Sequence, residues 1–221
     1  VMSVMNGFRT ELINKIVGFN SHITIKPYDK VIDQSKLKNK NLELISKNII
    51  FSNSGEAIIL KDKLSKGIVL RGYKSDDFSD LQIIKNKKFR GNISFDTNSL
   101  SIGNELSFAL DLHIGDEITL MSPSGVETII GSIPKQKTFV ITSIFNTGLA
   151  DFDNNIAFID LKTLENFFGY KTKDRNLEIY LKKPSNIEPQ KLIFQKIFDE
   201  EFVYSWADMN RSLFSALKVE R

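Results

Sequence analysis

The two ends of the chain show a similar pattern of apolar residues. Within 1–16 the apolar side chains recur at steps of three and four, which places them on one face of a helix. They are Val1, Val4, Met5, Phe8, Leu12 and Ile16. At the other end Asp208 is expected to cap a helix over 208–221, with a stripe made of Met209, Leu213, Phe214 and Leu217. Each stripe either packs against the domain or continues into a membrane helix beyond this sequence.

The middle of the chain is patterned mainly as β-strands. Alternation predicts strands over 22–26, 49–51, 57–60 and 67–73, and Asn53, Ser54 and Gly55 predict a turn between the second and third of them. A helix around 42–46 lies between the first two strands, and a helix over 105–112 precedes a turn at Gly115 and a strand over 117–121.

A long hairpin follows the strand 117–121. Its loop, 122–137, contains the turn formers Pro123, Gly125, Gly131 and Pro134, and its return strand covers 138–145. Ile129 and Ile130 lie near the expected tip, where a monomer has little reason to expose apolar residues. The loop therefore either docks a partner or folds back on the β-rich region.

After residue 155 the order changes to strand, helix, strand, helix, strand. The expected elements are 156–160, 161–168, 176–182, 189–198 and 202–206. Because the last part resembles the strand–helix–strand order near residue 22, we expect one α+β layer built from both chain ends, with a β-rich domain inserted between them.

The amino-acid composition excludes several classes of protein. The 221 residues are 41% hydrophobic and 26% charged, as in ordinary globular proteins. The net charge of +3 is too weak and diffuse for nucleic-acid binding, and the absence of cysteine excludes disulfides and thiolate chemistry. No apolar run is long enough to span a membrane and no signal peptide is recognisable. Since the chain opens at Val1 and ends within a helical pattern, we expect it to be a fragment.

Candidate chemistry is scarce. His22 and His113 have no second histidine at ligand spacing, so each is interpreted as structural or surface. The segment 151–162 imitates a calcium loop, but Ile156 and Lys162 occupy the positions that need glycine and glutamate, which favours a polar loop around 151–155. Nucleophile elbows, P-loops and dinucleotide motifs are missing. We therefore expect no enzyme activity, no metal site and no cofactor.

Several segments resemble one family, the lipoprotein-releasing ABC permeases (LolC/LolE). The opening 1–8, and then 15–19 with 22–25, look like the exit from the first membrane helix and the first strand. The run 102–118 is similar to a motif of the wider superfamily that includes the MacB pumps. More specific is 131–139, Gly-Ser-Ile-Pro-Lys-Gln-Lys-Thr-Phe, which resembles the return side of the hairpin called the hook. The ending 206–220 resembles the approach to the second membrane helix.

The resemblance implies a MacB-like periplasmic domain of α+β class. Residues 1–16 would continue from the first transmembrane helix and 208–221 would lead to the second. A porter subdomain would comprise 17–66 and 174–207, and a sabre subdomain 67–173 with the hook at 122–137. The implied location is the inner membrane, with this domain in the periplasm.

The resemblance also implies a function and partners. The permease would extract lipoproteins and pass them to a LolA-type periplasmic carrier, together with a second permease subunit and a LolD-type ATPase dimer that hydrolyses ATP. The implied carrier-binding residues are Ile129, Ile130, Gly131, Ile133, Pro134, Gln136 and Lys137. Lys137 replaces the family's arginine, so it keeps the charge and loses bidentate geometry, and Ile129 and Ile130 stand where a tip proline is expected.

Two other functions are compatible with the sequence. A MacB-type or FtsX-type permease domain would serve efflux or the regulation of cell-wall hydrolases, and absence of a hook would favour it. A soluble β-rich binding module would use the terminal stripes as core. The sequence does not distinguish a LolC role from a LolE role.

Overall fold

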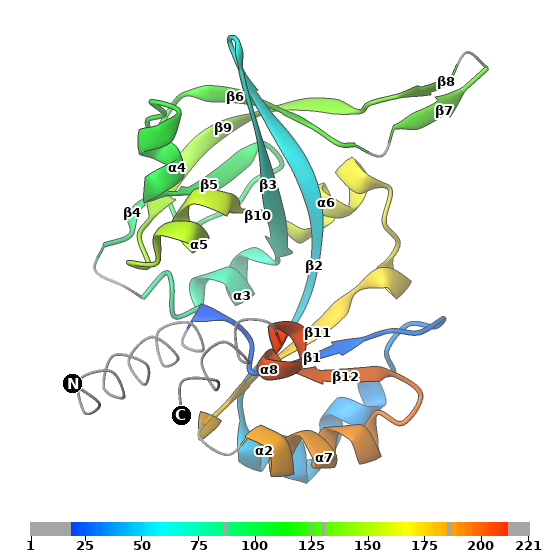
Figure 1. Ribbon diagram of the computed structural model, residues 1–221. Coiled ribbons are helices and arrows are strands. Elements are labelled where there is room, and N and C mark those ends of the chain that lie inside the picture. Colours follow the sequence, from blue (N-terminus) through cyan, green and yellow to red (C-terminus); the bar gives the residue numbers. More distant parts are fainter. Residues whose placement is uncertain (1–18, 86–87, 124, 130, 185–186, 212–221) are drawn as a thin grey trace. The chain divides into compact units, whose positions relative to one another are not determined.

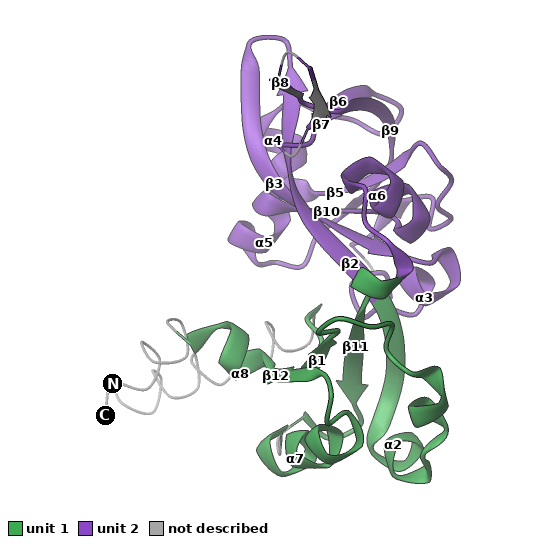
Figure 2. Cartoon of the chain, turned by 90° about the vertical axis from the view of Figure 1, so that its right-hand side faces the viewer, with its two compact units in different colours: residues 1–51, 173–221 green, residues 52–172 purple. Residues whose placement is uncertain are grey.

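The structure is a computed structural model that describes residues 19–85, 88–123, 125–129, 131–184 and 187–211. The expected helix 1–16 and the stripe from Leu213 to Leu217 lie outside these residues. The chain forms two compact units, one of residues 1–51 and 173–221 and one of residues 52–172 (Figure 2). In the described residues, no helix is long and apolar enough to cross a membrane.

The first unit is a twisted sheet with helices packed on it. Its strands are β12 (Phe202–Ser205), β1 (Ile23–Lys26), β11 (Asn176–Leu181) and the first part of β2 (Ser46–Lys61). β1 runs antiparallel to both neighbours, with Ile23 opposite Ile179 and Ser205. The helical elements are η1 (Gln34–Lys38), α2 (Lys40–Ile45), α7 (Ile187–Ile197) and α8 (Trp206–Met209).

Apolar residues at alternate positions of the strands form the hydrophobic core of this unit. Strand residues with almost no exposed surface meet Leu42 from α2 and Phe194 from α7. The strand members are Ile23, Ile25, Leu177, Ile179, Leu181 and Val203. Because α2 and α7 each present an apolar face to the sheet, both chain ends contribute to one core, as the sequence predicted.

The second unit is a small closed barrel. Its strands are the rest of β2, β3 (Leu64–Tyr73), β10 (Ile156–Asp160), β5 (Ser99–Gly103), β9 (Gln136–Phe145) and β6 (Glu117–Met121). Each strand pairs with the next, and β6 pairs with β2 to close the circle. β4 (Arg90–Gly91) adds to the outer edge of β9, and η2 (Thr172–Asp174) lies where the chain returns to the first unit. Closure removes the exposed strand edges that promote aggregation.

The barrel is filled by two alternate residues from each strand. They are Ala57, Ile59, Ile68, Leu70, Leu100, Ile102, Ile118, Leu120, Phe139, Ile141, Ala157 and Ile159. Helices α4 (Asn104–Ala109) and α6 (Leu161–Phe168) contribute Leu106, Leu164 and Phe167 to the same core. Around it, α3 (Ser75–Ser79) and α5 (Ala150–Asn155) enclose an aromatic cluster that has Phe158 at its centre. These units confirm the predicted α+β class with a β-rich insertion.

The predicted turn at 53–55 is wrong. β2 runs without interruption from Ser46 to Lys61, and the chain turns at Asp62 and Lys63, where Asp62 has φ 52°. Gly55 serves packing instead, because a Cβ there would lie 2.7 Å from the ring of Phe168 in α6. β2 spans both units, which divide at 51/52 and at 172/173, whereas the expected subdomain limits were 66/67 and 173/174.

Two local predictions also need correction. Residues 150–155 form helix α5 rather than a polar loop, and Asp153 is buried. Its carboxylate accepts hydrogen bonds from the backbone N–H and hydroxyl of Thr147, at 3.0 and 2.7 Å. Burial raises the pKa of Asp153, and the Thr147 bonds only partly offset that rise. At the last helix Ser205, not Asp208, is the N-cap, because its side chain accepts the N–H of Asp208.

Candidate partner-binding hairpin

The loop between β6 and β9 forms the predicted hairpin. The β6–β9 ladder runs to the pair Met121–Gln136, and the next rung is the bond from Ser122 N–H to the Lys135 carbonyl (2.8 Å). Beyond it, β7 (Val126–Thr128) pairs antiparallel with β8 (Gly131–Ile133) as a separate two-stranded ribbon. Figure 1 shows this ribbon projecting beyond the rest of the second unit. This ribbon lies within the predicted hook, 122–137, whose last two residues, Gln136 and Lys137, belong to β9.

The hook carries exposed apolar side chains at its turn and on its return side. Ile129 is fully exposed at the turn, Ile133 is 53% exposed, and Pro134 is also exposed. Gly131 has φ 120°, which glycine adopts without strain as the chain turns back. Ile130 lies outside the described residues. Exposed apolar side chains that lie close together are typical of partner-binding surfaces.

The base of the hook is anchored by two lysines. The Lys137 ammonium donates to the Thr97 carbonyl at 2.6 Å and lies 5.0 Å from the centre of the Phe139 ring. The Lys135 ammonium donates to the carbonyl of Asn166 at the end of α6. Both lysines therefore fix the direction of the hook, and their charges stay at its base.

Gln136 and Asp96 complete the base. Gln136 is exposed, and its side-chain nitrogen lies 3.8 Å from the Met121 sulfur. Asp96 belongs to the loop that binds Lys137. Bonds from Asn98 N–H and Ser99, with a smaller contribution from the charge of Lys137, hold the pKa of Asp96 below its usual value. The base of the hook thus carries the positive charge of Lys137 and the negative charge of Asp96 close together.

Comparison with known proteins identifies the relatives of the chain. No protein-family model matches the sequence. LolC, the lipoprotein-releasing system transmembrane protein of Buchnera aphidicola (subspecies Schizaphis graminum), is 28% identical over 231 aligned positions covering the whole chain. LolC of Neisseria meningitidis is 25% identical over 233 positions, again covering the whole chain. The chain is similar to LolC along its whole length.

This similarity confirms the resemblance to the lipoprotein-releasing permeases. The chain spans about half the length of the curated LolC proteins it matches, 55% in both cases. Among solved structures, it is similar to the periplasmic region of MacB from Actinobacillus actinomycetemcomitans, with a TM-score of 0.48 and 8% identity over 92% of this chain and 98% of that one. The extracellular domain of the ABC-type transporter YknZ gives a TM-score of 0.45 and 13% identity over 82% and 100%.

The two histidines have the structural and surface positions expected of them. The imidazole Nδ1 of His22 is buried and accepts the N–H of Leu181 at 2.7 Å, across the β1–β11 pair. His113 is exposed in the turn after α4, beside Asp116. No cluster of three or more potential metal ligands occurs among the residues that the structure describes.

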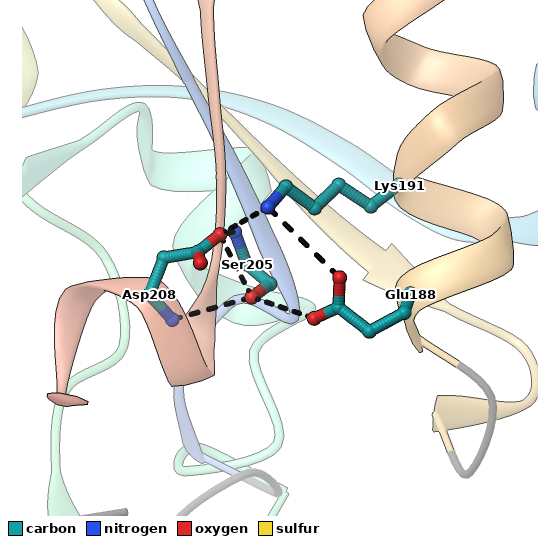
Figure 3. A network of polar contacts seen from close by, with 4 residues as sticks. All are labelled: Glu188, Lys191, Ser205 and Asp208. Atoms are coloured by element: carbon teal, nitrogen blue, oxygen red, sulfur yellow. Dashed lines mark hydrogen bonds and ion pairs between the residues drawn. The ribbon is translucent and has the colours of Figure 1, made fainter.

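Sequence reasoning missed a polar network that fixes α8. Asp208 accepts from Ser205 N–H (2.8 Å) and from the Lys191 ammonium (2.5 Å) of α7, as Figure 3 shows. The Ser205 hydroxyl lies 3.0 Å from Asp208 and 3.3 Å from the Glu188 carboxylate. The only visible signal was Ser205 three residues before Asp208, the spacing of a capping box. Through this network α8 is tied to the sheet and to α7.

The network gives a pH-dependent prediction. Burial raises the pKa of Asp208, but the Lys191 and Ser205 bonds outweigh it, so the folded-state pKa lies below the usual 3.8. The carboxylate therefore stabilises the fold above pH 3.8, and this contribution is lost as the pH falls through the folded-state pKa. We expect Asp208→Asn to lower the free energy of unfolding by about 1 kcal/mol at pH 7.

Urea unfolding at several pH values measures this effect. The difference between wild type and Asp208→Asn should shrink below pH 3.8. Lys191→Met, alone and combined with Asp208→Asn, measures the coupling between the two side chains. A difference that stays constant down to the acid limit would rule out the assigned role of the ionised carboxylate.

Proposed function

We propose that this chain is the periplasmic domain of the permease subunit of an inner-membrane ABC transporter. The complete transporter would extract lipoproteins from the membrane and hand them to a LolA-type carrier recruited by the hook. The observation that carries the proposal is a projecting hairpin with exposed Ile129, Ile133 and Pro134, anchored at its base by Lys135 and Lys137.

The proposal assigns ATP hydrolysis and membrane insertion to other parts of the transporter. The domain itself is non-catalytic in this proposal, and a LolD-type ATPase dimer hydrolyses ATP on the cytoplasmic side. A second permease subunit completes the membrane part. In this proposal the segments 1–16 and 208–221 would continue into membrane helices, and conformational change would reach the domain through them.

The geometry of the hook suits recruitment of a carrier. Its backbone is a paired ribbon held at the base, so its tip loses little conformational entropy on binding. Exposed Ile129 and Ile133 provide apolar contact, and contacts of this kind concentrate the binding energy in a few residues. Lys137 adds a charge at the base, which affects association rate more than affinity.

Binding measurements with the cognate carrier test this proposal. We expect replacement of both Ile129 and Ile133 by aspartate to cost about 2 kcal/mol or more of binding free energy, roughly a thirtyfold loss of affinity. The melting temperature should change little, because Ile129 is fully exposed and Ile133 is about half exposed. Isothermal titration of wild type and variant gives both affinities.

A deletion provides the stronger control. Removal of 126–134 leaves the Met121–Gln136 pair of the barrel intact, so the remaining domain should fold. Equal affinity of wild type and deletion variant for the carrier would remove the hook from the mechanism. That result would favour a MacB-type or FtsX-type domain, or a soluble binding module.

A further inference from the structure

Helix α8 is held to the first unit at two points. Its first residue, Trp206, is 5% exposed and donates its N–H to the His22 carbonyl, just before β1, at 2.9 Å. The second point is Asp208, whose carboxylate binds the Lys191 ammonium of α7. Met209, the last residue of the helix, is 51% exposed and so adds little burial. The part of α8 that follows Trp206 therefore depends mainly on the carboxylate of Asp208.

The groups that hold Asp208 also face a second carboxylate. Glu188 lies three residues before Lys191 on α7, so the two side chains share one face of that helix. The Glu188 carboxylate is 4.0 Å from the Lys191 ammonium and 3.3 Å from the Ser205 hydroxyl. The Asp208 carboxylate is closer to both groups, at 2.5 and 3.0 Å. One ammonium and one hydroxyl thus lie between two carboxylates, one on α8 and one on α7 (Figure 3).

The second carboxylate makes the loss of the first one less costly. The Lys191 side chain is only 15% exposed, so it would be a poorly solvated, unpaired charge if Asp208 moved away and nothing replaced it. Glu188 is 67% exposed on the same helix, and rotation of its side chain brings it to Lys191. Glu188 also repels Asp208 while both carboxylates share one ammonium. It therefore stabilises the state in which Asp208 has left and destabilises the state in which Asp208 is bound.

We propose that these side chains form a latch with two states, closed when Lys191 pairs with Asp208 and open when Lys191 pairs with Glu188. In the open state Trp206 stays in place, so the residues after it move while the sheet remains paired. The inference goes beyond the proposed function, because the latch needs neither a carrier nor an ATPase. In the proposed permease, opening would let the segment 208–221 change direction without unfolding the first unit.

Native-state hydrogen exchange of the ¹⁵N-labelled chain, followed by NMR, tests the latch. The N–H of Ser205 is bonded to Asp208 in the closed state only, whereas the N–H of Trp206 is bonded to His22 in both states. After correction for intrinsic rates, Ser205 should therefore exchange faster than Trp206. Glu188→Gln removes the alternative partner of the ammonium. We expect this variant to slow the exchange of Ser205 about fivefold, the effect of one exposed ion pair, and to leave Trp206 unchanged.

Two further variants make the result specific. Glu43→Gln removes an exposed carboxylate from α2 of the same unit and should change neither rate. In a Lys191→Met background, Glu188→Gln should affect Ser205 far less than it does in the wild type, because the shared ammonium is absent.

Three results would each overturn the latch. They are faster or unchanged Ser205 exchange in Glu188→Gln, an equal effect of Glu43→Gln, and equal corrected rates for Ser205 and Trp206 in every variant. The last result would mean that α8 opens only when the whole unit unfolds. Since no carrier enters these measurements, the latch and the proposed function can fail independently.

Discussion

Gly103→Ala is expected to lower the free energy of unfolding by about 3 kcal/mol or more. Gly103 ends β5 where α4 begins, and a Cβ there would lie 1.9 Å from the Asp153 carbonyl oxygen and 2.5 Å from its carbonyl carbon. These are backbone atoms of α5, which the bonds between Asp153 and Thr147 hold in place. A backbone cannot rotate away as a flexible side chain can, so α5 must shift.

Urea unfolding followed by far-UV circular dichroism measures this loss. Gly67→Ala is the matched control, because it places a methyl group in a strand with nothing within 4 Å. Its stability should stay within about 0.5 kcal/mol of wild type. Equal midpoints for Gly103→Ala and Gly67→Ala would show that α5 does not pack on β5 as described.

Phe158→Ala is expected to cost about 4 kcal/mol. Phe158 in β10 is 1% exposed, and its ring centre lies 5.9 Å from that of Tyr73, 5.4 Å from Phe78 and 5.0 Å from Phe145. Truncation would remove the central ring of this cluster and leave a cavity among rigid neighbours that cannot collapse easily.

Two further variants serve as controls for the removal of the Phe158 ring. Phe158→Leu keeps part of the volume and should cost clearly less than alanine. Phe108→Ala removes a phenylalanine that is 75% exposed in α4, so it should change stability by no more than about 0.5 kcal/mol. A Phe158→Ala loss as small as that of Phe108→Ala would contradict the described packing.

The local pattern of apolar and polar residues was sufficient to predict many of the helices and strands. The strand 156–160, the helix 161–168 and the strand 117–121 were predicted with their observed bounds, because apolar alternation and helical spacing are both local properties. The turn at 53–55 failed for a non-local reason. Asn, Ser and Gly are turn formers, yet here Gly55 accommodates Phe168, which lies more than a hundred residues away in the sequence.

The candidate site was only partly predictable. Turn residues and the family resemblance indicated a hairpin at 122–137, and a paired ribbon is present there. The contacts that hold the base of the hairpin could not be predicted from the sequence, because the side chains of Lys135 and Lys137 donate to main-chain carbonyls of Asn166 and Thr97. Every residue has such a carbonyl, so residue type carries no information about it. Strand register, which sets Met121 opposite Gln136, depends likewise on tertiary pairing.

The closure of the barrel at the Met121–Gln136 pair makes the hook an exchangeable part. β6 and β9 are already joined below that pair, and each has a second partner strand, β2 for β6 and β5 for β9. Insertions, deletions or a transplanted ribbon between these two residues therefore leave the barrel ladder and its core unchanged. Under the proposed function, partner choice can diverge at this loop while the rest of the domain stays constant. A chimera that carries the corresponding loop of a LolC relative would therefore separate changes in specificity from changes in the fold.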